Sequence, residues 1–407
     1  KRRHPSRSSS SLHQAEGLVL GTRGTRRAAA AAVMTLGSAW DYSPSERPNL
    51  TDARTDADWQ DAPVAVAELV IALIVILAGA QLFTNGVEWI GEGFGLSEGA
   101  VGSVLAAVGT ALPETLLPLV AIVSGHAAGE EIGVGAILGA PFMLTTLAMF
   151  VLGVATLIFV RRRGRPTDLA GDRTVVQRDL GYFLVMYALA TAAGLIHIRP
   201  LHWALALVLV VGYVLYVRRH FATPGETRME QEAESEIKPL YVWSWLRRGI
   251  VRLEPWSKGS PAWPSFVQVG VALVLIVGGA RLFVSGVNTL ADRLGVPHLV
   301  FALLLAPLAT ELPEKFNSVI WVRRNKDTLA LGNMTGAMVF QSSFPVSVGL
   351  LLTSWRLAHA GLVAAFIALA AGSALYATLR FRGRLSARLL LVQGVFYVSY
   401  VVYVLTR

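Results

Sequence analysis

Apolar stretches of about the length of a bilayer crossing recur along this chain from residue 63 to its end. Of its 407 residues, 54% are hydrophobic and 15% are charged. In lipid every backbone polar group needs an internal partner, so only helices and closed barrels span a membrane. The stretches lack the apolar/polar alternation of barrel strands. The chain is therefore predicted to be an all-α polytopic membrane protein.

The apolar stretches predict ten transmembrane helices, because about 20 apolar residues span a bilayer. Their approximate limits are 63–84, 98–124, 131–160, 180–196, 200–217, 264–285, 297–322, 328–353, 357–378 and 387–405.

The polar segments divide the chain into four parts. Residues 1–62 are rich in Arg, Ser, Ala and Asp and predict a disordered N-terminal extension. Residues 63–217 and 264–407 each hold five predicted spans. The linker between them, residues 218–263, carries tryptophans interleaved with arginines from Trp243 onward, which predicts a helix on the membrane surface. A regulatory site in this linker is the alternative to a simple tether.

One short string occurs twice at a spacing of 200 residues. Residues 109–114 read GTALPE and residues 309–314 read ATELPE. An ungapped alignment of 78–124 with 278–324 contains thirteen identical residues, which indicates an internal repeat. Five spans per repeat is an odd number, so the second copy enters the membrane from the opposite side. The fold class is therefore predicted to be two inverted five-helix repeats.

The distribution of basic residues predicts the orientation. The Arg- and Lys-rich loops follow the third, fifth, seventh and ninth spans, at 161–178, 218–258, 323–326 and 380–388, and all four fall on one side. The positive-inside rule makes that side cytoplasmic and the N-terminus external. The net charge of +9 is explained by these loops, so no nucleic-acid partner is expected. A multi-pass protein of the cytoplasmic (inner) membrane is predicted.

Both repeated strings place Pro-Glu at membrane depth, as Pro113-Glu114 and Pro313-Glu314. Proline removes a helical donor and frees carbonyls around residues 107–110 and 307–310, which predicts that the second and seventh helices are broken. An ionised glutamate there is costly without a cation, a proton or a partner. Glu114 and Glu314 are therefore predicted to hold an ion between the repeats. A protonated glutamate that bonds across helices is the alternative.

Other polar residues surround the two glutamates in sequence. Thr110 and Thr310 precede them by one helical turn and could face the same ion or bond back to their own helix. Glu311 could be a third carboxylate, or it could form a surface pair with Lys315 at i+4. Gln341, Ser342 and Ser343 form a polar group that either lines the ion path or packs helices. Such hard oxygen donors favour calcium or sodium.

Several kinds of chemistry find no support in the sequence. The chain has no cysteine, and it contains no phosphate-binding glycine loop, paired metal histidines or nucleophile elbow. We therefore expect neither an enzyme nor an ATP-driven pump, and no cofactor other than the transported ions.

The paired strings on a five-plus-five plan resemble the sodium/calcium exchanger family of the cation/calcium antiporter superfamily, especially its prokaryotic members. The resemblance covers residues 63–405. It implies that Glu114 and Glu314 are the central calcium ligands, that Thr110 and Thr310 coordinate sodium or calcium, and that the carbonyls of Ala107 and Pro307 face a sodium site.

This chain departs from the family pattern at several ligand positions. Ala111 and Glu311 stand where the family usually has serine, and Leu144 and Gln341 stand where it usually has Asn or Asp. The site then holds only two certain negative charges, enough for one calcium or two monovalent ions. This weakens the expectation of three-sodium coupling and favours exchange against protons.

The sequence thus predicts a secondary antiporter that exports calcium in exchange for sodium or protons by alternating access. The alternatives are a calcium/proton or monovalent cation antiporter of the same superfamily, a cation channel, and a membrane scaffold that does not transport.

Overall fold

The computed structural model describes the backbone of residues 62–93, 106–125, 128–160, 164, 167–169, 171–221, 239–249 and 263–406. Within these ranges, the side chains of 62, 92–93, 106–113, 220–221, 246–249, 309 and 312–314 lie outside the description. The predicted N-terminal extension, apart from its last residue, and most of the central linker also fall outside it.

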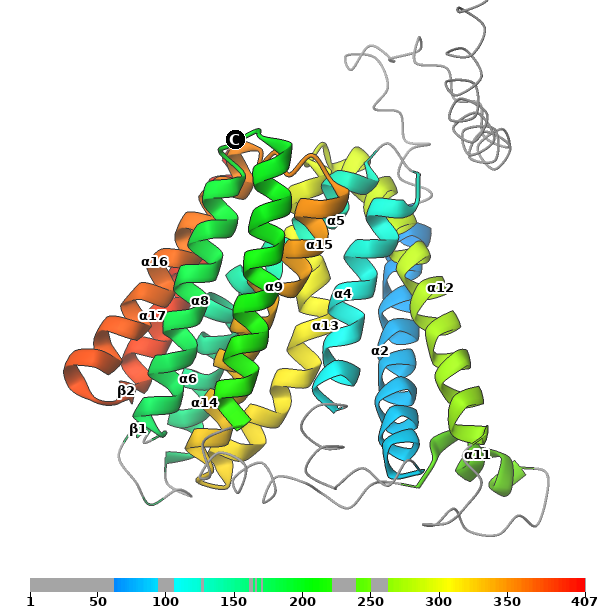
Figure 1. Cartoon of the computed structure of the whole chain (residues 1–407), viewed down its shortest axis with the longest axis horizontal. Coiled ribbons are helices and arrows are strands. Elements are labelled where there is room, and N and C mark those ends of the chain that lie inside the picture. Colours follow the sequence, from blue (N-terminus) through cyan, green and yellow to red (C-terminus); the bar gives the residue numbers. More distant parts are fainter. Residues whose placement is uncertain are drawn as a thin grey trace, which may run out of the picture. The chain divides into compact units, whose positions relative to one another are not determined.

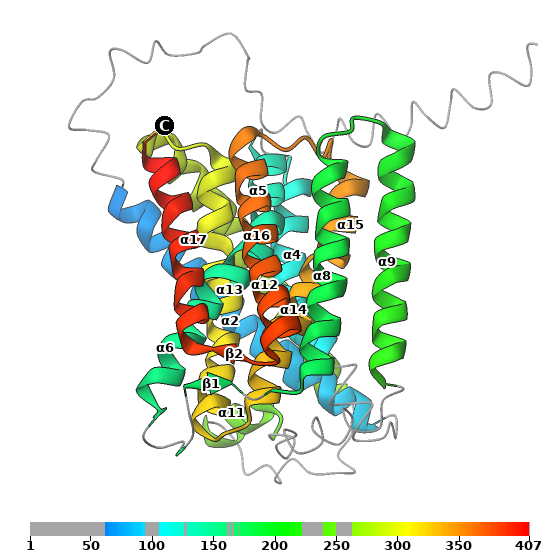
Figure 2. The same ribbon diagram turned by 90° about the vertical axis from the view of Figure 1, so that its left-hand side faces the viewer.

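The described part of the chain from residue 62 onward is a bundle of helices that run roughly alongside one another (Figures 1 and 2). The first half contains α2 (Ala62–Gly93), α4 (Ala106–Val123), α5 (Gly129–Met143), the π-helix η3 (Leu144–Ala148), α6 (Met149–Ile158), α8 (Arg173–Ala193) and α9 (Arg199–Phe221). The linker contributes α11 (Tyr241–Gly249). The second half contains α12 (Trp263–Leu294), α13 (His298–Arg323), α14 (Asp327–Gln341), α15 (Phe344–Leu352), α16 (His359–Arg382) and α17 (Ala387–Leu405).

Each predicted span contains a helix, but not all of these helices are uniformly apolar. Within the described residues, seven helical segments are long and apolar enough to cross a bilayer: 63–91, 129–158, 199–219, 263–294, 327–352, 359–382 and 387–405. Shorter apolar stretches occur in α4 and α13, at Glu114–Val123 and His298–Leu308. In α13 the apolar stretch stops short of Glu311, Glu314 and Lys315, the residues that make this helix a candidate for function.

The first helices of the two halves, α2 and α12, lie side by side and run in opposite directions (Figure 1). Glycines allow the close approach. A Cβ atom at Gly86 would lie 2.8 Å from Val269 Cγ2, and one at Gly286 would lie 2.8 Å from Leu69 Cγ. The two contacts are equivalent, since Gly286 and Leu69 are the counterparts, 200 positions away, of Gly86 and Val269.

Two glycines in α5 bring its backbone against α13. A Cβ at Gly135 would lie 2.2 Å from the carbonyl oxygen of Leu299, and one at Gly139 would lie 2.1 Å from that of Leu303. No side chain larger than hydrogen fits at such distances. The third predicted span is thereby placed directly on the helix that carries Glu311 and Glu314.

The predicted breaks in the second and seventh spans are wrong. α4 continues through Pro113, and α13 is one helix from His298 to Arg323 that contains Pro307 and Pro313. The prolines remove single hydrogen bonds without ending either helix.

The interruptions lie instead in the third and eighth spans. The π-helix η3 separates α5 from α6 at residues 144–148, and a turn at Ser342 and Ser343 separates α14 from α15. These positions correspond in the repeat register, in which Leu144 matches Gln341. Pro141 and Pro345 stand beside the two irregularities, so each interruption adjoins a residue that has no N–H group.

Among the described residues, the largest buried apolar cluster lies among α5, α6, α8, α9 and α13 to α17. Phe142 stands within it, with its ring centroid 4.9 Å from that of Tyr400. This core makes the third span, with its irregular segment, one of the most enclosed elements of the bundle.

The described elements within the predicted basic loops, β1 (Asp168–Leu169), β2 (Leu385–Ser386) and α11, lie at one end of the bundle (Figure 1). There β1 pairs antiparallel with β2, and Arg384 forms a 3.0 Å ion pair with Asp168. The Asp172 N–H donates to Thr328 Oγ1 at the start of α14. The C-terminus lies at the opposite end.

Candidate functional site

Glu114 stands in the middle of α4 and is 6% exposed. Its helix packs against α2, α5 and α12 and also contacts α13. The carboxyl group therefore lies in the protein interior rather than on the lipid-facing surface. Thr110 and Ala107 lie on the same helix, but their side chains are outside the described part of the structure.

Thr310 is 5% exposed, and its hydroxyl donates to the Ala306 carbonyl across 3.2 Å. This is the back-bonding that the sequence analysis left open. A hydroxyl that donates one bond keeps lone pairs that can accept or bind a cation. Thr310 thus remains a predicted ligand whose oxygen is free to accept, and its role is untested.

Pro307 has no N–H, so the Leu303 carbonyl loses its helical donor. This carbonyl is the one that lies against Gly139, and the ring of Pro307 is 2.8 Å from a Cβ atom placed on the same glycine. The close approach of α5 thus falls at the level of the predicted sodium site. The Pro307 carbonyl stays a predicted ligand.

Glu311, Lys315 and Gln341 form a buried polar cluster. Lys315 Nζ lies 3.3 Å from Glu311 Oε2, and Gln341 Nε2 donates to Glu311 Oε1 over 2.5 Å. The three side chains are 5% exposed or less. The predicted i, i+4 pair therefore exists, but the surface location is wrong. The cluster also joins two predicted site residues, Glu311 and Gln341, from different helices.

Additional polar contacts link α13 to α14 near this cluster. Ser318 is one helical turn beyond Glu314, and its hydroxyl accepts from Asn333 Nδ2 over 2.9 Å. Ser342 and Ser343 instead bond to carbonyls of their own helix, Val339 among them. Their hydroxyls stabilise the local turn.

The side chain of Glu314 lies outside the described part of the structure, although its backbone is part of α13. No group of three or more His, Asp or Glu side chains suited to a metal ion occurs among the residues that are described. The meeting of Glu114 with Glu314 therefore remains a prediction.

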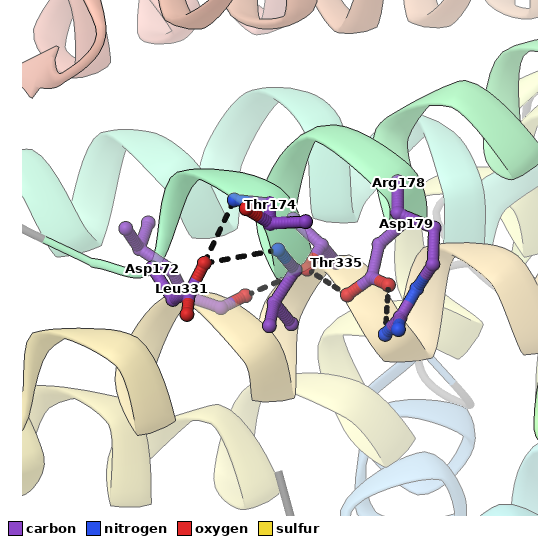
Figure 3. A network of polar contacts seen from close by, with 7 residues as sticks. Asp172, Thr174, Arg178, Asp179, Leu331 and Thr335 are labelled. Carbon is purple, nitrogen blue, oxygen red and sulfur yellow. Dashed lines mark hydrogen bonds and ion pairs between the residues drawn. The ribbon is translucent and has the colours of Figure 1, made fainter. Parts of the chain in front are cut away.

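Sequence reasoning missed two features. Lys315 was considered only as a surface partner, and the buried network around Asp179 was not anticipated. Thr335 Oγ1 lies 2.8 Å from Asp179 Oδ2, and Arg178 Nη2 lies 3.2 Å from Asp179 Oδ1 (Figure 3). The Arg178 guanidinium also stands over the ring of Tyr216, 5.5 Å from its centroid. The available signal was an Arg-Asp pair just ahead of an apolar run.

The family model described as "Sodium/calcium exchanger protein" matches residues 64–221 and 264–406 of this chain. The chain belongs to this family. The recognition made from the two repeated strings is thereby confirmed, and the protein is a multi-pass membrane protein of an exchanger family. The two matched segments start 200 residues apart, and the gap between them corresponds to the central linker.

Individual relatives of this exchanger cover most of its length. It is 25% identical over 299 residues to the "Putative antiporter CaxA" of Alkalimonas amylolytica, covering 71% of this chain and 81% of the relative. It is 24% identical over 290 residues to the "Sodium/calcium exchanger MaX1" of Methanosarcina acetivorans, covering 67% and 78%. The solved structure titled "Crystal Structure of H+/Ca2+ Exchanger CAX" shares the fold, with a TM-score of 0.59, 15% identity, and coverage of 86% and 89%.

Proposed function

We propose that this exchanger is a secondary active antiporter that moves calcium out of the cytoplasm in exchange for sodium or protons. The observation that carries the proposal is the burial of Glu114 inside a bundle whose two halves both match the exchanger family. A buried carboxylate at membrane depth needs a cation or a proton, and an exchanger supplies both in turn.

We infer that the ten predicted spans form two inverted repeats. Support comes from the antiparallel contact of α2 and α12, in which residues 200 positions apart make equivalent contacts. Such a contact is what a two-fold axis perpendicular to the helices produces. Inverted repeats place a site at their interface and allow it to open to either face in turn.

In the proposed site, Glu114 and Glu314 hold the ion, with oxygen atoms of Thr110, Thr310, Ala107 and Pro307 as further ligands. The two carboxylates neutralise one calcium ion or two monovalent cations. Because both kinds of ion compete for the same groups, occupation by one excludes the other. The gradient of the driving ion then moves calcium against its own gradient.

We place the protein in the cytoplasmic membrane, with the basic loops and the central linker in the cytoplasm and the N-terminus outside. The position of β1, β2 and α11 at one end of the bundle supports a common side for these loops (Figure 1). The positive-inside rule assigns that side to the cytoplasm.

Calcium uptake into proteoliposomes tests the proposal. Purified protein is reconstituted, and uptake of labelled calcium is driven by an outward sodium gradient or, separately, by a proton gradient. Uptake under one gradient identifies the coupling ion, and Glu114→Gln should abolish it. Glu131→Gln removes a carboxylate from the exposed first turn of α5 and serves as the matched control.

Two other outcomes would contradict antiport. Calcium flux that needs no driving ion would indicate a channel. No flux under either gradient, from protein that elutes as a single folded species, would indicate a scaffold that has lost transport.

A further inference from the structure

The carboxylate of Glu311 is engaged on both oxygens. Gln341 donates to Oε1, and the Lys315 ammonium faces Oε2 at 3.3 Å. A donor group thus lies beside each oxygen, an arrangement that suits a carboxylate carrying its full negative charge. The geometry therefore fits an ionised Glu311 paired with a protonated Lys315.

Lys315 stands beside apolar side chains of its own and neighbouring helices. A small cavity beside it is lined by Ala148, Val151 and Met334. An ammonium group in such surroundings requires a countercharge, and Glu311 supplies a carboxylate within ion-pair distance. Lys315 and Glu311 lie one turn apart on the same helix, so they stay together however the two halves of the protein move.

We propose that Lys315 is a built-in cation of the ion site, which neutralises Glu311 and leaves only Glu114 and Glu314 to exchange ions. This inference rests on the antiport function proposed above. The tethered ammonium fills one cation position permanently, because it cannot leave with the transported ions. Glu311 then helps to hold the site together, but its negative charge is not available to bind a transported ion.

The consequence is electroneutral exchange. Two exchangeable carboxylates carry one calcium ion in one direction and two monovalent cations in the other, so no net charge crosses the membrane. Without Lys315 the site would hold three exchangeable negative charges. A third monovalent ion would then accompany the return step, and the cycle would move one net charge.

Membrane potential distinguishes these two cases. In proteoliposomes that contain valinomycin, a tenfold potassium gradient sets a potential that shifts the final calcium ratio about tenfold for each net charge moved per cycle. Wild-type protein should show no shift, and Lys315→Gln should show a shift of about tenfold. The double variant Lys315→Gln with Glu311→Gln should lose the shift again. The same potassium gradient without valinomycin controls for any direct effect of potassium.

A matched control tests whether the voltage response depends on the charge of Lys315 in particular. Arg323→Gln removes one positive charge from the exposed last turn of α13 and should respond to potential as the wild type does. A voltage-dependent wild type, or a Lys315→Gln variant that transports with no shift, would overturn the inference while leaving antiport intact. Absence of calcium transport by folded wild type under every gradient would instead overturn the proposed function.

A second variant covers the case in which Lys315→Gln does not fold. Glu311→Gln keeps the ammonium but removes its countercharge, so the excess positive charge should weaken calcium binding at least about tenfold. Isothermal titration with calcium measures this change. Unaltered calcium affinity in Glu311→Gln would overturn the inference.

Discussion

Gly79 of α2 and Gly279 of α12 make the same contact from opposite sides. A Cβ at Gly79 would lie 2.8 Å from Ile276 Cγ1, and one at Gly279 would lie 2.8 Å from Ile76 Cγ1. The carbonyls of Ala272 and Ala72 stand at 3.1 Å in the two cases. The distances are equal because the two contacts are made by corresponding residues of the internal repeat.

Alanine at either glycine should therefore destabilise the protein to a similar degree. We expect a loss of about 2 kcal/mol for Gly79→Ala and for Gly279→Ala, because the added methyl group meets both a side chain and a carbonyl. Thermal unfolding in detergent, followed by intrinsic fluorescence, measures the loss. Gly278→Ala is the control, since a Cβ there meets no atom within 4 Å. A loss at only one of the two glycines would contradict the symmetry of the contact.

The contact of α5 with α13 should tolerate an added side chain even less well than the contact of α2 with α12. At Gly139 a Cβ would lie 2.1 Å from a backbone oxygen, which no side-chain rotation can relieve. We expect Gly139→Ala to destabilise the fold by at least about 3 kcal/mol. Gly332→Ala, at the position of the other repeat that matches Gly135, meets no atom within 4 Å and should cause no loss. Equal melting temperatures for these two variants would contradict the close packing.

The sequence predicted helix positions well because apolar length is itself the physical requirement for crossing a bilayer. The close approach at Gly135 and Gly139 also follows from local sequence, since two small residues one turn apart form a flat face. The sequence could not predict that α13 is the partner of this face, because the partner depends on how the two halves assemble.

The positions of the helix irregularities were mispredicted for an identifiable reason. Proline was expected to break α4 and α13 at Pro113 and Pro313, but a helix can lose a single bond and continue. The Thr145 hydroxyl donates to the Pro141 carbonyl beside one irregular segment, but the same back-bonding at Thr310 leaves α13 continuous, so these side-chain bonds do not decide where a helix is interrupted. Likewise, the i, i+4 spacing of Glu311 and Lys315 is the same on a surface and in a core, so spacing alone could not place the pair inside.

The network around Asp179 should contribute to stability by joining α8 to α14. Asp179→Asn removes the countercharge of Arg178, and we expect a loss of about 2 kcal/mol, less than for a fully buried pair because Arg178 is partly exposed. Thr335→Val should cost about 1 kcal/mol. A double-mutant cycle on thermal unfolding should give a coupling energy near 1 kcal/mol, and strict additivity would show that the 2.8 Å contact carries no energy.

The linker helix α11 is attached to the bundle by two amide side chains. Asn85 Oδ1 accepts from the Tyr241 N–H, and Gln268 Oε1 accepts from the Val242 N–H. These acceptors serve the first N–H groups of α11, which have no partner within the helix.

We expect Asn85→Ala or Gln268→Ala to destabilise the first turn of α11 by about 1 kcal/mol, which makes hydrogen exchange there about fivefold faster. Gln81→Ala, exposed on the same helix as Asn85, is the control. Unchanged exchange in both variants would show that α11 is held by other contacts.

An aspartate at residue 341 should create a third exchangeable charge. In Gln341→Asp the new carboxylate would stand beside Glu311 Oε1, so that two carboxylates would share the single ammonium of Lys315. Like charges in the protein interior repel strongly, so the variant should unfold at a lower temperature than wild type in the presence of a chelator.

Calcium should reverse this loss of stability in Gln341→Asp. If the added charge tightens calcium binding tenfold, saturating calcium stabilises the variant by about 1.4 kcal/mol more than it stabilises wild type. Gln393→Asp places a carboxylate at another fully buried glutamine, in α17, and should be destabilised equally with and without calcium. A calcium-dependent shift of the same size in Gln341→Asp and wild type would place residue 341 outside the ion site.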